Sequence, residues 1–181
     1  LTSAAFHESW LADKARAGGG HLTWLGIHWL DLAMFITGSR IERVAGFAGN
    51  VGGQPINVED SVAMAMRFDN GTFGTLTSGY YLDKGSQSHL KIWGSNGWLQ
   101  INSDTPNAVQ WYSAKSEKSP AEQTFTGPND FDPYVVFVHD AIRASMGLAE
   151  PPITAKESLR VLKTVFALYK AAETGTTQRI E

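Results

Sequence analysis

One stretch of the chain alternates apolar and smaller or polar side chains at every second position, which is the pattern of a strand with one buried face. Its apolar positions are Val62, Met64, Met66 and Phe68. The pair Asn70-Gly71 follows, and this pair is typical of a two-residue hairpin turn in which both residues take positive φ angles. We therefore expect two antiparallel strands, up to residue 68 and over 72–81, with one face against a core.

The rest of the chain predicts further strands between two groups of helices. Strands are expected at 90–93 and 98–101 around a Gly-Ser-Asn-Gly turn, and at 108–113 and 123–125. Helices are expected near 6–14, over 22–37 before Gly38, over 131–146, and over 154–174, where Thr154 and Glu157 form a capping box and Gly175 ends the helix. This order predicts an α+β fold, with an open, mostly antiparallel sheet and helices packed on one face.

Composition excludes several classes of protein. The 181 residues are 43% hydrophobic with a net charge of −3, which suits one globular domain over 1–181 and gives no basic patch for nucleic acid or an anionic membrane. The absence of cysteine excludes disulfides and thiolate metal sites. The first residues lack the features of a signal peptide, and no apolar stretch is long enough to span a bilayer, so we expect a cytoplasmic protein.

The segment Gly-Gly-Gly-His-Leu-Thr-Trp-Leu-Gly-Ile-His-Trp-Leu-Asp, residues 18–31, places polar side chains within an apolar helix. Apolar residues cover nearly every side of this helix, which predicts that the helix is enclosed. His28 and Asp31 are three residues apart and can meet on one face. Either Asp31 satisfies a core histidine, or it orients an imidazole that moves a proton in a site. A third interpretation adds His21 and makes a His-His-Asp metal site.

The glycine clusters do not form a nucleotide-binding motif. Gly18 to Gly20 do not follow a predicted strand, and the glycines within 46–53 lack the G-x-G-x-x-G spacing and precede Gln54-Pro55 rather than a helix. We therefore expect no cofactor-binding residues in this chain.

Four stretches together resemble the C-terminal domain of the glucose-fructose oxidoreductase / inositol dehydrogenase family, known as Gfo/Idh/MocA. The first is residues 18–31, which resemble the family's G-G-G-x-L-x-D-x-G-x-H-x-x-D segment. The others are VEDSVAMAMRFDNGTFGTL at 58–76, LKIWGSNGWLQI at 90–101 and ESLRVLKTVFALYKAAETG at 157–175. The resemblance implies a dihydrodipicolinate-reductase-like C-terminal domain, without its Rossmann domain, from an oxidoreductase that uses NAD or NADP.

The resemblance also implies roles for single residues. His28 matches the histidine that takes a proton from a substrate hydroxyl, and Asp31 would support it. The family often has aspartate where this chain has Trp24, so Trp24 either stacks on a sugar ring or marks an altered site. Tyr80 is a candidate substrate contact by its position near a strand end, as are Tyr81, Lys84 and His89.

We expect a small sugar or cyclitol substrate, and a homo-oligomer formed through the open sheet face. The whole protein would be an enzyme, whereas this polypeptide alone would neither bind NAD(P) nor turn over. The alternative is a non-catalytic oligomerisation or binding module derived from the same family.

Overall fold

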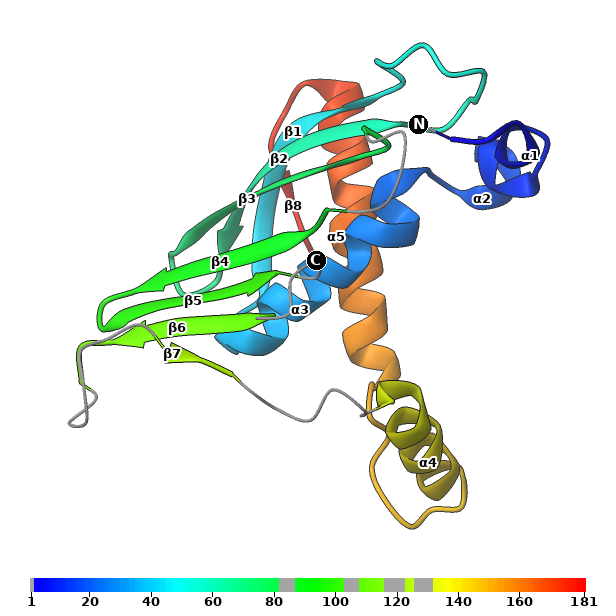
Figure 1. Cartoon of the computed structure of the whole chain (residues 1–181). Helices are drawn as coiled ribbons and strands as arrows, with labels where there is room; N and C mark the ends of the chain where they lie inside the picture. Colours follow the sequence, from blue (N-terminus) through cyan, green and yellow to red (C-terminus); the bar gives the residue numbers. More distant parts are fainter. Residues whose placement is uncertain (1, 82–86, 103–107, 116–122, 126–131) are drawn as a thin grey trace. The chain divides into compact units, whose positions relative to one another are not determined.

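The computed structural model of the protein describes residues 2–81, 87–102, 108–115, 123–125 and 132–181. The chain divides into two compact units, one formed by 1–84 with 153–181 and the other by 85–152 (Figure 1). The α+β class and the antiparallel pairing predicted from the sequence are confirmed, because every described strand pair is antiparallel.

The first unit contains a four-stranded sheet in the order β3-β2-β1-β8 and most of the helices. Its strands are β1 (Ile41–Gly49), β2 (Ser61–Phe68), β3 (Phe73–Gly79) and β8 (Gln178–Arg179). Its helical elements are α1 (Ala4–His7), a 3₁₀ turn (Trp10–Ala12), α2 (Lys14–Ala17), the π turn η2 (Leu22–Gly26), α3 (Ile27–Thr37) and α5 (Ala155–Thr174). The one N-terminal helix expected near 6–14 is therefore three short turns.

The predicted hairpin joins β2 to β3, but its loop differs from the expected one. The N–H of Gly71 donates to the carbonyl of Phe68, and the N–H of Phe68 donates to the carbonyl of Thr72, so the loop has three residues. Gly71 has φ of 87°, while no non-glycine residue in the described chain has positive φ. The expected positive φ at Asn70 is wrong, because a three-residue hairpin needs only one residue in that region.

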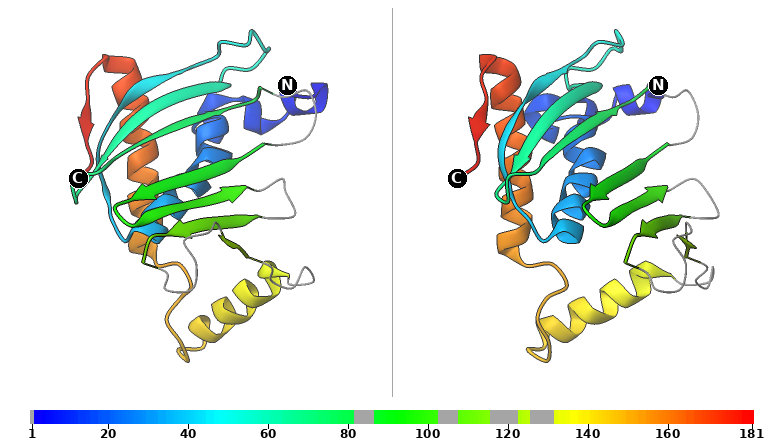
Figure 2. Two further views of the ribbon diagram at one scale, coloured as in Figure 1. Left: turned by 60° about the vertical axis from the view of Figure 1, so that its left-hand side comes forward. Right: turned by 90° about the vertical axis from the view of Figure 1, so that its left-hand side faces the viewer.

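Helices α3 and α5 cover one face of the first sheet, as the two views of Figure 2 show. Side chains from both helices and from the sheet make up the core between them. These are Leu22, Leu30 and Met34 from the η2–α3 helix, Ile41 and Val44 from β1, Val62, Met64, Met66 and Phe68 from β2, and Val161, Val165 and Leu168 from α5. The period-two burial predicted for β2 is confirmed.

Local signals at the ends of α5 behave as the sequence predicts. Thr154 accepts a hydrogen bond from the backbone N–H of Glu157, and the Glu157 carboxylate accepts one from the backbone N–H of Thr154. Gly175 ends the helix in the left-handed region, after which β8 pairs with β1. Both caps involve residues that are close in sequence, so a sequence pattern can predict them.

The second unit contains the sheet β4-β5-β6-β7 and helix α4. The elements are β4 (His89–Gly94), β5 (Gly97–Asn102), β6 (Val109–Ser113), β7 (Gln123–Thr124) and α4 (Pro133–Ser145). The second predicted hairpin is confirmed, with Trp93 paired to Trp98 across the turn. The predicted start of α4 at 131 lies outside the described residues. Within the described chain, no helix has both the length and the apolar character that crossing a membrane requires.

Candidate functional site

The helix with His28 begins with a π turn, η2, and continues as α3. One side of it enters the core through Leu22, Gly26, Leu30 and Met34. Because these residues repeat every four positions, they form a single buried stripe rather than a surface that surrounds the helix. Single π turns within α-helices are rare, and many of those known lie at functional sites.

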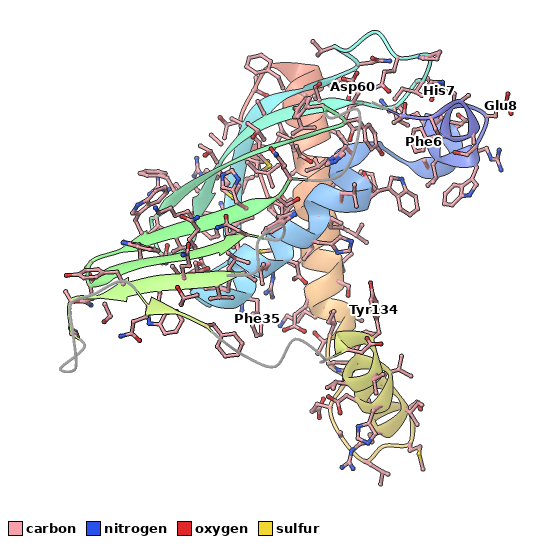
Figure 3. The ribbon with its side chains drawn as sticks, in the orientation of Figure 1. Phe6, His7, Glu8, Phe35, Asp60 and Tyr134 are labelled. Carbon is pink, nitrogen blue, oxygen red and sulfur yellow. The ribbon has the colours of Figure 1, made fainter. Side chains whose placement is uncertain are left out.

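The opposite side of this helix is exposed, and His28 lies on it. Leu25 is 49% exposed, Phe35 is 83% exposed, and the His28 side chain between them is also exposed. Figure 3 labels Phe35 on α3. The expectation that the helix is enclosed is wrong, because a count of apolar residues does not distinguish a core from an apolar surface. His28 therefore lies on an exposed apolar stripe, which we define as Leu25, His28 and Phe35.

His28 and Asp31 are not joined by a hydrogen bond or an ion pair in the described chain. Asp31 is half-buried one turn after His28. The core-histidine interpretation is wrong, because an exposed imidazole is not a buried polar group that needs a partner. What the structure presents is an imidazole on an apolar surface, where either ring nitrogen can exchange a proton with a bound molecule.

Trp24, at the position where the related segment has aspartate, packs within the protein. Its indole meets the ring of Trp10 edge to face at 5.1 Å between centroids and borders a small cluster of buried residues. This cluster contains Ala12, Ala17, Ile56 and Val58. The indole Nε1 of Trp24 is buried and has no hydrogen-bond partner in the described chain.

His21 and Tyr80 form a second group of polar side chains. Nδ1 of His21 lies 2.5 Å from Oγ of Ser78, and the His21 and Tyr80 rings meet edge to face at 4.7 Å. Burial lowers the pKa of His21. Burial, together with the negative charge of Glu59, raises the pKa of Tyr80. Both residues therefore favour their neutral forms near pH 7.

The metal interpretation finds no support in the described chain. No group of three histidine, aspartate or glutamate side chains there lies close enough together to hold a metal ion. His21 is directed to Ser78, away from the exposed stripe with His28. Of the other residues considered from the sequence, Tyr81 donates its hydroxyl to the carbonyl of Ser78, and Lys84 lies outside the described residues.

Two adjacent carboxylates just before β2, Glu59 and Asp60, are not among the candidate residues predicted from the sequence. Asp60, at that end of the strand (Figure 3), accepts hydrogen bonds from the N–H groups of Val51 and Gly52 and from the Ser61 hydroxyl. Burial acts to raise the pKa of Asp60, but these hydrogen bonds and one from Gln54 outweigh it and lower the pKa. Asp60 therefore holds the loop before β2 in place.

Glu59 is the second of these carboxylates, and it binds the start of the η2–α3 helix. Its two oxygens accept hydrogen bonds from the N–H of Gly20 at 2.6 Å and of Leu22 at 3.1 Å. The Tyr169 hydroxyl on α5 donates to Glu59 at 2.8 Å and also lies 2.7 Å from Oγ1 of Thr23. Burial and the neighbouring Glu59 charge raise the pKa of Tyr169 well above its ordinary value, so its hydroxyl stays protonated.

The strand pairing of the described residues differs from that of a Rossmann unit. A Rossmann unit is built from parallel strands joined by helices, whereas every described strand pair here is antiparallel.

The sequence matches the family described as "GFO/IDH/MocA C-terminal domain" over residues 2–100, more than half of the chain. The protein belongs to this family. It is also similar to 1,5-anhydro-D-fructose reductase from Ensifer adhaerens, with 23% identity over 96% of this chain and 51% of the relative.

Solved structures with the same fold include two enzymes that act on carbohydrates. Aldose-aldose oxidoreductase from Caulobacter crescentus, solved with glycerol, is 20% identical with a TM-score of 0.82, over 99% of this chain and 52% of that one. Levoglucosan dehydrogenase, solved with NADH and levoglucosan, is 19% identical with a TM-score of 0.82, over 95% of this chain and 53% of that one. The chain thus spans about half the length of the relatives that it matches.

Proposed function

We propose that the chain is the single C-terminal substrate and oligomerisation domain of an NAD(P)-dependent oxidoreductase that acts on a hydroxyl of a sugar or cyclitol. The observation that supports this most is the placement of His28. The family's histidine position falls on an exposed stripe whose apolar flanks, Leu25 and Phe35, are open in this chain. An apolar surface around a proton-accepting group suits a site that a second domain closes.

The role of His28 is to move one proton. In the oxidation direction, the imidazole accepts the proton of the substrate hydroxyl as the C–O bond becomes a carbonyl, and it returns a proton to the oxygen in the reverse direction. The other half of the chemistry, hydride transfer at the same carbon, would be supplied by a nicotinamide cofactor when bound. The exposed position of His28 leaves its ring nitrogens free for this exchange.

The neighbouring residues are proposed to support His28. Asp31, one turn later and half-buried, is the carboxylate nearest to it in sequence and would orient the ring in the closed enzyme. Trp24 and Tyr80 remain candidate substrate contacts. Trp24 packs against Trp10 and is only partly exposed, so little of its indole is open to a sugar ring. Its proposed role is therefore to form a wall of the site.

The experiment that tests this proposal is His28→Ala in the full-length protein. Turnover of sugar and cyclitol substrates with NAD or NADP should fall about 100-fold or more, because general acid–base catalysis contributes 10²–10⁴-fold. His139→Ala, at an exposed histidine of α4, is the matched control and should change turnover little. Turnover of His28→Ala close to that of the parent would refute the role of His28.

We also propose that a second copy of the chain covers the open face of the first sheet. On this face Phe47 is 80% exposed and Phe73 is 78% exposed, with Ala63 and Ala65 exposed on the central strand between them. The two alanines and two phenylalanines make an apolar area on this face, bordered by Arg67, whose guanidinium lies 6.0 Å from the centre of the Phe73 ring. An apolar area of this kind can pack against its own copy. The same face is the observation that favours the alternative, a non-catalytic oligomerisation module.

Sedimentation of the full-length protein tests this interface. The parent should be a dimer or larger at micromolar concentration, and Phe47→Glu should shift it toward the monomer, because the substitution buries a charge at the interface. Val51→Glu is the control, since Val51 is as exposed but lies in the loop after β1. A parent that is strictly monomeric would contradict the proposal.

A further inference from the structure

The start of the η2–α3 helix is not capped by the side chain of an adjacent residue. The first N–H groups of a helix have no partner within the helix and are usually bound by a side chain just before it. No side chain at the position before η2 makes such a bond. The carboxylate of Glu59, 39 residues from Gly20 and 37 from Leu22, takes this role instead.

Glu59 is buried, with 9% of the residue exposed, and its carboxylate has three donors, the two backbone N–H groups and the Tyr169 hydroxyl. A buried carboxylate is tolerated only with such partners, and the positive end of the helix favours it further. The backbone carbonyl of Glu59 also accepts the N–H of His21. Gly20, His21 and Leu22 are thereby bound to Glu59, just before β2, and Thr23 is bound to Tyr169 on α5.

The glycines before the helix make this contact possible. A Cβ atom at Gly20 would lie 2.0 Å from the carbonyl oxygen of Glu59, and one at Gly19 would lie 2.2 Å from the Tyr169 hydroxyl. Both distances are too short for any side chain. The glycine run therefore allows the backbone to approach the Glu59–Tyr169 pair.

Tyr169 binds the π turn itself as well as Glu59. Since its only hydroxyl proton goes to Glu59, the Thr23 hydroxyl donates to Tyr169. Thr23 lies within η2, five residues before His28. The rotation of the helix through this turn sets the side from which His28 emerges, because a π turn has more residues per turn than the α-helix that follows.

We propose that Glu59 and Tyr169 are positioning residues for His28: they hold the helix start and the π turn so that His28 emerges on the exposed side of the helix, between Leu25 and Phe35. The inference rests on the proposed function, because it assigns no role beyond the placement of that imidazole. The Glu59 carboxylate and the Tyr169 hydroxyl bond to each other and to the helix start, so the proposal assigns them no contact with the substrate.

A double-mutant cycle in the full-length protein separates positioning from general stability. Tyr169→Phe removes one hydroxyl, and a displacement of His28 by even 1 Å should lower kcat about 10- to 100-fold with KM for NAD(P) within about twofold. In the His28→Ala background the same substitution should cost less than about twofold, because its effect passes through the missing imidazole. Tyr112→Phe, on β6 of the second unit, is the matched control.

The outcomes are distinct from a failure of the proposed function. An equal loss of kcat in both backgrounds, or no loss in either, would overturn the positioning role, whereas a His28→Ala variant with normal turnover would overturn the function itself. If Tyr169→Phe does not fold, Thr23→Val removes the other hydroxyl of the pair in the same cycle, with the same two results expected.

Discussion

Two histidines of one helix have opposite surroundings. His28 is exposed between Leu25 and Phe35, whereas His21 is half-buried, bound to Ser78 and packed against Tyr80. Residue type gives both the same chemistry, so their burial decides their roles. An exposed imidazole can serve a substrate, while a half-buried one with a lowered pKa is a part of the fold that resists protonation.

The lowered pKa of His21 predicts a pH dependence of stability. Below its ordinary pKa of 6.5, the unfolded chain binds a proton that the folded chain resists, so stability falls as the pH falls until the folded pKa is reached. His21→Gln, which keeps a hydrogen-bonding side chain but cannot titrate, should therefore lose less Tm than the parent between about pH 7.5 and about pH 5.5.

His89→Gln is the control for this measurement, because His89 is exposed on β4. It should lose as much Tm as the parent over the same pH range. An equal loss in His21→Gln would show that His21 titrates alike in the folded and unfolded chain.

At the scale of elements, the sequence predicts what neighbouring residues decide. The capping box at Thr154 and the alternation of β2 are local patterns, and both are confirmed. The cap of the η2–α3 helix is not local, because Glu59 is separated from Gly20 by the helix itself, strand β1 and a loop. No spacing rule connects two such positions, although the unexplained run of glycines was a signal that something approaches the backbone there.

This remote cap gives a prediction for Gly20. Gly20→Ala forces a methyl group against the Glu59 carbonyl oxygen and should lower the free energy of unfolding by about 1–3 kcal/mol or more, the usual cost of overpacking. Chemical denaturation measures the change. Gly49→Ala is the matched control, since a Cβ there meets nothing within 4 Å, and it should change stability by less than about 0.5 kcal/mol.

A Gly20→Ala variant as stable as Gly49→Ala would mean that the helix start is free to move away from Glu59. The same result would weaken the positioning role of Glu59, since that role requires a helix start held in place.

The apolar helix shows where the sequence could not decide. Its composition predicts burial, yet Leu25 and Phe35 are exposed while Leu22 and Leu30 are buried. Apolar residues mark surfaces that leave water, either inside a domain or against another one, and composition does not separate the two. His28 lies on the exposed apolar side of this helix, so it is a candidate catalytic group rather than a core histidine.

At the scale of the whole molecule, the chain presents two uncovered apolar surfaces in its first unit. One is the open sheet face with Phe47 and Phe73, and the other is the stripe around His28. The relatives that it matches are about twice as long. We propose a second copy for the sheet face and the nucleotide-holding domain for the stripe, so that one chain would contribute to both assembly and catalysis.

The most direct test is the structure of the full-length protein with NAD(P) and a sugar or cyclitol substrate. The account predicts that a ring nitrogen of His28 lies within hydrogen-bond reach, about 2.6–3.2 Å, of the hydroxyl whose carbon faces the nicotinamide. A complex in which His28 points into solvent, with another side chain bonded to that hydroxyl, would contradict it.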